Sequence, residues 1–244
     1  MTGASVCRHC GAPLRAATRF CGRCGRPTPT VRRARAAEER GEFRRSQRAG
    51  LAVAVVFVGV ILSLALVFAI SDGDRSAGTL LAMLALDLAV GGAATWLLGP
   101  GAGRESVPLR TAPRWVLLAV PVGAAAFAVS WGYVELLHAA TGGESGAGPD
   151  RLGIVAAVVV APLIEEWLCR GVLWTALSRV VPARRTVVLT ALLFAVMHGL
   201  QGLYLALPHR FVGGLALGWL RWRSGSLVPC VVAHLVHNAL AVVV

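Results

Sequence analysis

Three ionisable side chains lie within a long apolar stretch of this sequence. Glu165, Glu166 and Arg170 stand inside the run of apolar residues from Leu152 to Leu177. Charges at bilayer depth are costly, are usually paired, and by default mark a working site. Glu166 and Arg170 are four residues apart with the acid first, so a helix pairs them on one face. Glu165 then points about 100° away from Glu166, which leaves it free for chemistry.

Two later apolar stretches carry further polar side chains. His198 ends one of them, and the last stretch holds His234 and Asn238, four residues apart and therefore on one helix face, with His237 beside them. A rise of 1.5 Å per residue from the expected cytoplasmic ends puts Glu165 at a depth of about 20 Å. The same count gives about 18–20 Å for His198 and about 10–17 Å for the residues of the last stretch. We therefore expect these groups to meet in one layer of the membrane.

The composition is typical of a protein that lies in a bilayer. Hydrophobic residues make up 56% of the chain and charged residues only 15%. Several apolar runs approach the length of about 20 residues with which a helix crosses a bilayer. The predicted fold class is an all-α polytopic membrane protein with about seven transmembrane helices. The expected spans are 51–70, 77–98, 114–137, 152–178, 186–201, 208–222 and 227–244.

The basic charge predicts the orientation of these spans. All 24 basic residues are Arg, and the formal net charge is +12. With a cytoplasmic N-terminus and seven spans, fifteen arginines lie in residues 28–48 and the inner loops, against Arg75, Arg151 and Arg210 on the opposite side. This excess is typical of cytoplasmic loops and indicates a multi-pass protein of the cytoplasmic membrane. Nucleic acid is not an expected partner, because the arginines are spread over many loops and mostly lack interleaved aromatic residues.

The weakest expected span is 208–222. It is short and begins with Pro208, His209 and Arg210. If it does not cross the membrane, the last span reverses its direction.

Four cysteines near the N-terminus form two CxxC pairs: Cys7, Cys10, Cys21 and Cys24. No apolar segment of a signal peptide precedes residue 51, so we expect this region to stay in the reducing cytoplasm, where the pattern favours zinc over disulfides. Residues 1–27 are too few to fold on a hydrophobic core, and a metal has to supply the stability. A four-thiolate site has no open coordination position, which indicates a structural or docking module. The glycines beside the cysteines allow tight turns there: Gly11, Gly22 and Gly25. His9, inside the first pair, is not expected to be a ligand.

The polar residues of the membrane stretches form three motifs in order along the chain. They are EExxxR at Glu165 to Arg170, FxxxH at Phe194 to His198 and HxxxN at His234 to Asn238. Together they resemble the signature motifs of the CPBP family, which comprises the CAAX prenyl protease type II and the bacteriocin-processing, abortive-infection proteins. The resemblance covers about residues 150–244, and earlier spans match only in hydropathy. Together with the cysteine pattern, which resembles a short zinc ribbon, it divides the chain into a zinc ribbon at 1–27, a basic cytoplasmic linker at 28–48 and a transmembrane protease domain at 49–244.

The resemblance implies a role for each motif residue. Glu165 is the general base on a water molecule, His198 helps to bind that water, and His234 and Asn238 hold the oxyanion. Buried donors of this kind stabilise developing negative charge more than they could in water. Glu166 and Arg170 form a supporting ion pair that holds the helix face presenting Glu165. Glu165, His198 and His234 could also ligate zinc, but the chain lacks HExxH, and we favour a metal-free glutamate peptidase.

The predicted function is an intramembrane endopeptidase that cuts a peptide bond of a membrane-associated substrate, either prenylated or simply hydrophobic. Its expected partners are the lipid bilayer, a peptide or protein substrate and a protein that binds the zinc ribbon. The alternative is a non-catalytic scaffold, immunity or transport protein that uses the same buried polar groups. Outside the motifs, the single acids Asp87 and Glu135 are interpreted as helix contacts or snorkelling groups. His138 and His209 are interpreted as loop or interface residues. Cys169 and Cys230 are expected to be small buried hydrophobic residues.

Overall fold

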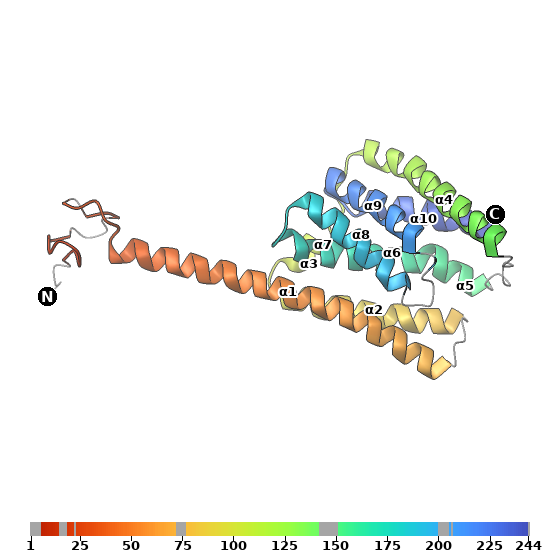
Figure 1. The fold of residues 1–244 in the computed structure, drawn as a ribbon, viewed down its shortest axis with the longest axis horizontal. Coiled ribbons are helices and arrows are strands. Elements are labelled where there is room, and N and C mark those ends of the chain that lie inside the picture. The colour runs from red at the N-terminus through yellow and green to blue at the C-terminus, as the bar shows by residue number, and fades with distance from the viewer. Residues whose placement is uncertain are drawn as a thin grey trace. The chain divides into compact units, whose positions relative to one another are not determined.

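The computed structural model describes residues 6–14, 19–21, 23–71, 77–141, 151–199, 205 and 207–243. Apart from two isolated β-bridges, all regular structure in these ranges is helical (Figure 1). The predicted all-α fold class is therefore confirmed. The chain divides into two compact units, Met1–Gln47 and Arg48–Val244, and each is described by itself.

The first unit contains two turns with the same backbone pattern. In each, a glycine N–H donates to the carbonyl of the first cysteine of the pair, Gly11 to Cys7 at 2.8 Å and Gly25 to Cys21 at 2.9 Å. Both glycines have positive φ, 68° and 69°, which a residue with a side chain rarely adopts. Each turn is closed by a β-bridge, Val6 with Pro13 and Phe20 with Pro27. Gly22, the third glycine that we expected to assist, lies outside the described residues.

The second unit is built from helices that coincide with the seven apolar segments expected from the sequence. Residues 200, 201 and 244 of those segments lie outside the described residues. Helix α1 begins in the first unit and continues through the first expected span. The helices are α1 (Pro29–Ser71), α2 (Ala77–Leu98), α3 (Ala102–Ser106), α4 (Pro113–Thr141), α5 (Arg151–Val155), η1 (Ala156–Val160), α6 (Ala161–Glu166), η2 (Trp167–Leu173), α7 (Trp174–Ser178), α8 (Ala183–Gly199), α9 (Leu207–Ser224) and α10 (Val228–Val243).

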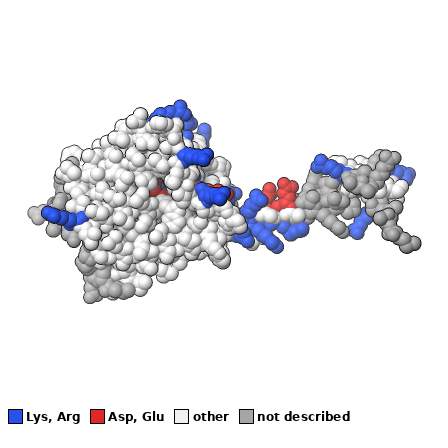
Figure 2. All heavy atoms as spheres, turned by 180° about the vertical axis from the view of Figure 1, so that it is seen from behind, with Lys and Arg blue, Asp and Glu red and all other residues white. Residues whose placement is uncertain are grey.

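Four of these helical stretches are long and apolar enough to cross a membrane: Ala37–Val67, Gly78–Leu98, Pro113–Thr141 and Arg151–Ser178. Helix α10, Val228–Val243, is apolar but shorter. The last two helices before it have 17 and 18 residues, and α9 carries three arginines. The visible face of the helical unit is largely uncharged, with arginines at its edges (Figure 2). The chain is thus a multi-pass membrane protein with four clear spans, and the full count of seven stays a prediction.

The stretch from α5 to α7 lies between the α1–α2 pair and the group formed by α4, α9 and α10 (Figure 1). Small residues let the helices approach closely, as in many membrane bundles. A Cβ added at Gly123 of α4 would overlap the backbone carbonyl of Ala233 in α10, and one at Gly214 of α9 would lie 3.0 Å from the Cα of Ala191 in α8. Close backbone packing therefore fixes α4 against α10 and α9 against α8.

Three of the single polar or cysteine residues interpreted from the sequence can be checked in the core. Asp87 of α2 is buried and accepts a hydrogen bond of 2.9 Å from the hydroxyl of Ser63 in α1, so its interpretation as a helix contact is confirmed. Cys169 and Cys230 are fully buried, as expected.

The helix that carries the two adjacent glutamates is not a regular α-helix. Glu165 and Glu166 end the short helix α6, which lies between the π-helical turns η1 and η2. Such turns interrupt the α-helical hydrogen-bond ladder and are frequent at functional sites. Arg170 lies within η2, so the segment that holds the first motif has an altered backbone register.

Candidate active site

Glu166 and Arg170 form a fully buried ion pair. The Nη1 atom of Arg170 lies 2.9 Å from Oε1 of Glu166, and both side chains have 0% exposure. The pair is the one that the spacing of four residues predicted. A buried pair is stable only when further hydrogen bonds satisfy its remaining atoms.

Other helices supply part of those hydrogen bonds, whereas Oε2 of Glu166 and Nε of Arg170 have no partner among the described residues. The Nη2 of Arg170 donates to the carbonyl of Gly214 in α9 at 2.9 Å, and the guanidinium carbon lies 4.6 Å from the centre of the Phe194 ring of α8. Nδ1 of His234 lies 2.9 Å from the same Oε1 atom of Glu166. The backbone carbonyl of Arg170 accepts from Nε of Arg221 at 2.9 Å. The ion pair thus connects η2 to three other helices.

Glu165 is placed differently from its neighbour. Its Oε2 atom lies 3.8 Å from Nε2 of His234 and 3.9 Å from Nε2 of His198, and its side chain is 21% exposed. These distances exceed those of a direct hydrogen bond, and a bridging water molecule suits them better. The structure therefore brings together three of the side chains expected from separate spans.

The other ring nitrogen of each histidine indicates its tautomer. Nδ1 of His198 lies 2.8 Å from the carbonyl oxygen of Phe194, which can only accept, so Nδ1 carries the proton. The same reasoning applies to His234, because its Nδ1 faces the carboxylate of Glu166. In their neutral forms, both rings turn an Nε2 lone pair toward Glu165. Three acceptors thus converge on a space that needs a donor such as the O–H groups of water.

Asn238 makes other contacts than those of this group. Its Nδ2 donates to the carbonyl of Ala157 in η1 at 2.9 Å, and its Oδ1 lies 2.9 Å from Nδ1 of His237. Nε2 of His237 in turn lies 3.1 Å from the hydroxyl of Ser130 in α4. The interrupted ladder of η1 explains why the Ala157 carbonyl is available. The amide of Asn238 is therefore engaged in helix contacts instead of facing Glu165.

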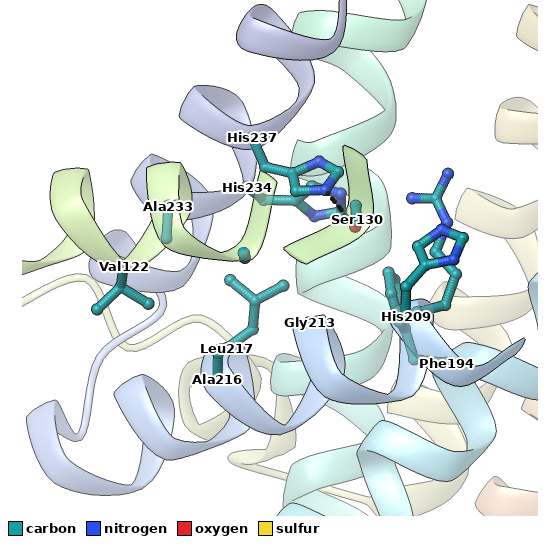
Figure 3. Close-up of a pocket in the computed structure, with 13 residues that line it drawn as sticks. Val122, Ser130, Phe194, His209, Gly213, Ala216, Leu217, Ala233, His234 and His237 are labelled. Atoms are coloured by element: carbon teal, nitrogen blue, oxygen red, sulfur yellow. Dashed lines mark hydrogen bonds between the residues drawn. The ribbon is translucent and has the colours of Figure 1, made fainter. Parts of the chain in front are cut away.

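A pocket adjoins this cluster between α4, α9 and α10 (Figure 3). Much of its lining is apolar, from residues such as Val122, Ala216 and Leu217. Its polar lining comes from four helix positions beside the predicted site and from His234 itself: Ser130, His209, Arg210, His234 and His237. The pocket is therefore largely apolar and is bounded on one side by the ring of His234, which faces Glu165.

The four N-terminal cysteines form a compact cluster. The Sγ atoms of Cys7 and Cys24 are 3.7 Å apart, as are those of Cys10 and Cys21, and all four lie within 4.8 Å of one another. Two thiolates bound to one tetrahedral zinc at about 2.3 Å lie roughly 3.8 Å apart, whereas a disulfide joins its sulfurs at about 2 Å. The cluster therefore has the geometry of a zinc site.

Backbone hydrogen bonds favour the thiolate form that zinc requires at two of the four cysteines. Hydrogen bonds from the backbone N–H groups of His9 and Cys10 lower the pKa of Cys7 to about 6. The N–H groups of Cys24 and Arg23 lower the pKa of Cys21 in the same way. The predicted structural zinc site is confirmed by this donor set together with the family match below.

Two segments of the chain match models of known families. Residues 148–240 match the model described as type II CAAX prenyl endopeptidase Rce1-like. The chain carries an Rce1-like domain. Residues 6–28 match the model of a zinc-ribbon domain. Comparisons with curated proteins and with solved structures gave no match.

The Rce1-like domain includes all three motifs noted in the sequence. Its match supports a CAAX-type endopeptidase that acts in the membrane, in agreement with the resemblance. The catalytic type, glutamate or metal, is a separate matter. A metal site needs several ligand atoms close together. Among the described residues, the four cysteines of the ribbon form such a group, with all four sulfur atoms within 4.8 Å of one another.

Sequence reasoning missed two residues that line the pocket of the Rce1-like domain. Arg210 was assigned to a loop on the far side of the membrane, and His209 to a loop or interface. His209 is instead buried at 8% exposure, with its ring centre 5.3 Å from that of Tyr133 in α4. Both residues lie inside α9 and line the pocket. In the sequence, the two residues are polar side chains at the start of an apolar segment. Residues of a loop before a helix have the same pattern, so the sequence did not place them in the pocket.

Proposed function

We propose that Glu165 is the general base of an intramembrane endopeptidase. The observation that carries the proposal is the difference between the two adjacent carboxylates. Glu166 is fully buried and engaged by Arg170 and His234, whereas Glu165 is partly exposed and faces two histidine nitrogens at 3.8 and 3.9 Å. A general base needs this kind of freedom and a water molecule within reach.

The nucleophilic water would lie between Glu165 and His198. It donates one O–H to the carboxylate and the other to the Nε2 lone pair of His198, which leaves an oxygen lone pair for the carbonyl carbon of the substrate. Glu165 takes the first proton as the oxygen attacks, and a tetrahedral intermediate with an oxyanion forms. The proton then passes from Glu165 to the nitrogen of the leaving group, and the peptide bond breaks.

His234 would serve the oxyanion in its protonated form. Glu166 accepts from Nδ1 at 2.9 Å, so it orients the ring and stabilises an imidazolium, as the carboxylate does in other catalytic triads. Nε2 then donates toward the oxyanion. In this surrounding of low dielectric constant, such an interaction is stronger than in water. Arg170 compensates the charge of Glu166 and keeps the supporting group in place.

We further propose that the reaction proceeds without a metal ion at Glu165, as the motif chemistry favours. The distances of 3.8 and 3.9 Å exceed the spacing of about 3.3–3.6 Å expected between two ligands of one tetrahedral zinc. The test is a variant in which Cys7, Cys10, Cys21 and Cys24 are all changed to Ser. We expect it to retain cleavage activity while containing no zinc, and a full equivalent of zinc in this variant would contradict the proposal.

The substrate class follows from the description of the matched family, a type II CAAX prenyl endopeptidase. We propose a membrane-associated peptide or protein as substrate, cut in the cytoplasmic membrane by a chain whose N-terminus is cytoplasmic. The zinc ribbon would then bind a protein partner on that side. The probes are fluorogenic peptides ending in a farnesylated CAAX sequence, with unprenylated copies as controls.

The decisive experiment compares the wild-type protein with Glu165→Gln and Glu166→Gln variants in detergent micelles. We expect Glu165→Gln to lose activity by at least about 10²–10⁴-fold, because the amide cannot accept the proton. Glu166→Gln should lose less, since its amide oxygen still accepts from His234. Equal activity of the wild type and Glu165→Gln would refute the proposed base and favour a non-catalytic role.

A further inference from the structure

The pocket beside the proposed base contains the guanidinium of Arg210. This guanidinium makes no hydrogen bond or ion pair with any residue that the structure describes, and its Nε is buried and unsatisfied. Arg210 lines the same pocket as His234, whose Nε2 lies 3.8 Å from Oε2 of Glu165. A buried polar atom without a partner carries a free-energy cost, which a ligand can relieve.

The buried arginines of the helical unit have bonding partners on neighbouring helices, although Nε of Arg170, like Nε of Arg210, has none among the described residues. Arg170 bonds to Glu166 and to the Gly214 carbonyl, and Arg221 donates to the carbonyl of Arg170. These two side chains hold helices together. Arg210 differs from them because its surroundings include a pocket wall shared with His234.

The proposed reaction needs more than one donor at the oxyanion. The resemblance assigns this role to His234 and Asn238, but the Nδ2 of Asn238 already donates to the Ala157 carbonyl at 2.9 Å. His234 supplies one donor only when its ring is protonated. A second donor from the same pocket would complete the site without breaking the contact between α10 and η1.

We propose that Arg210 is a catalytic residue that donates to the oxyanion of the tetrahedral intermediate. A guanidinium presents several N–H donors in a planar fork and remains charged, so it matches an oxygen that gains negative charge. The inference rests on the proposed function. It adds a residue of α9 to a site otherwise formed by α6, η2, α8 and α10.

The experiment compares Arg210→Met and Arg210→Lys with an exposed control on the same helix, Arg223→Met. The substrate is a fluorogenic peptide that the wild type cleaves, and Glu165→Gln is assayed on it in parallel. Thermal unfolding of each variant in detergent is measured first, so that only folded protein enters the assay. We expect Arg210→Met to lower kcat by about 10²–10³-fold with little change in KM, because an oxyanion contact forms only in the transition state. Arg210→Lys should recover part of kcat, and Arg223→Met should resemble the wild type.

Three results would overturn the inference. Unchanged kcat in Arg210→Met would remove Arg210 from the reaction. A higher KM at unchanged kcat would make it a residue that binds the substrate in its ground state. In Arg210→Met, the acidic limb of the pH profile of kcat could shift while kcat on the plateau stays at the wild-type value. Arg210 would then act through Glu165 and not on the oxyanion. Activity that persists in Glu165→Gln would instead refute the proposed function itself, so the two failures are distinguishable.

Discussion

The zinc ribbon and the Glu165 cluster both gather reactive side chains, but they do so in opposite ways. The ribbon takes four identical ligands from eighteen residues of chain, Cys7 to Cys24, and closes them around one point. The membrane cluster takes one acid and two histidines from three helices and leaves their acceptors turned toward an open space. A closed set suits stability, whereas a set with unsatisfied acceptors suits a reacting molecule.

The difference also concerns what holds each group in position. In the ribbon, the ligands themselves are the main source of order, because the segment is too small for a core. In the helical unit, the order comes from the buried pair Glu166–Arg170 and from close helix packing, and Glu165 is not needed for it. In the ribbon, the same four cysteines bind the metal and stabilise the fold. In the helical unit, Glu166 stabilises the structure, and the neighbouring Glu165 is left for the reaction.

The largest expected effect is the removal of zinc from the ribbon. Structural zinc sites contribute about 10–16 kcal/mol to folding of small domains, so Cys7→Ser should unfold this segment. Metal analysis should find about one zinc per chain in the wild type and a clear loss in the variant. Limited proteolysis should then cut within residues 1–27. His9→Ala is the matched control, and loss of zinc in that variant would contradict a site made of four thiolates.

The next effect is the loss of one partner of the buried ion pair. Arg170→Met leaves the Glu166 charge uncompensated and should lower the free energy of unfolding by about 3–5 kcal/mol. The control is Glu105→Gln, which removes an exposed pair in which the Nη2 of Arg179 lies 2.8 Å from Oε2 of Glu105. It should cost about 0–1 kcal/mol. Thermal unfolding in detergent measures both, and equal shifts would show that burial does not distinguish the pairs.

These contrasts explain which features the sequence could predict. The cysteine cluster depends on two short turns, and the pair of Glu166 with Arg170 depends on a spacing of four residues, so both are local and were predicted correctly. The helices follow from apolar runs. The count of full spans is harder, because the arginines of α9 can lie inside a protein as well as in a loop, and Arg221 is buried at 8% exposure.

The remaining features depend on how helices cross. The partner of Asn238 is a carbonyl in the π-helical turn η1, and no motif reports such a turn. The placement of Arg210 and His209 depends on α9 packing beside α4 and α10. A hydropathy pattern indicates that a helix exists but not which of its residues face a pocket, so these positions required the structure.

The smallest of the three stability effects tests how close packing positions the site. A Cβ at Gly123 would overlap the backbone carbonyl of Ala233, one residue before His234, and backbone cannot yield as a flexible side chain can. Gly123→Ala should therefore separate α4 from α10 at a cost of about 1–3 kcal/mol. It should also reduce cleavage, because α10 carries the ring that faces Glu165. Gly132→Ala on the same helix meets nothing within 4 Å and should leave stability and cleavage unchanged or slightly improved. If Gly123→Ala destabilises the protein but leaves kcat unaffected, the position of His234 does not depend on α4. The contact with Glu166 would then hold His234 in place without help from α4. The groups that stabilise the helix packing and those that carry out the reaction would then be separate.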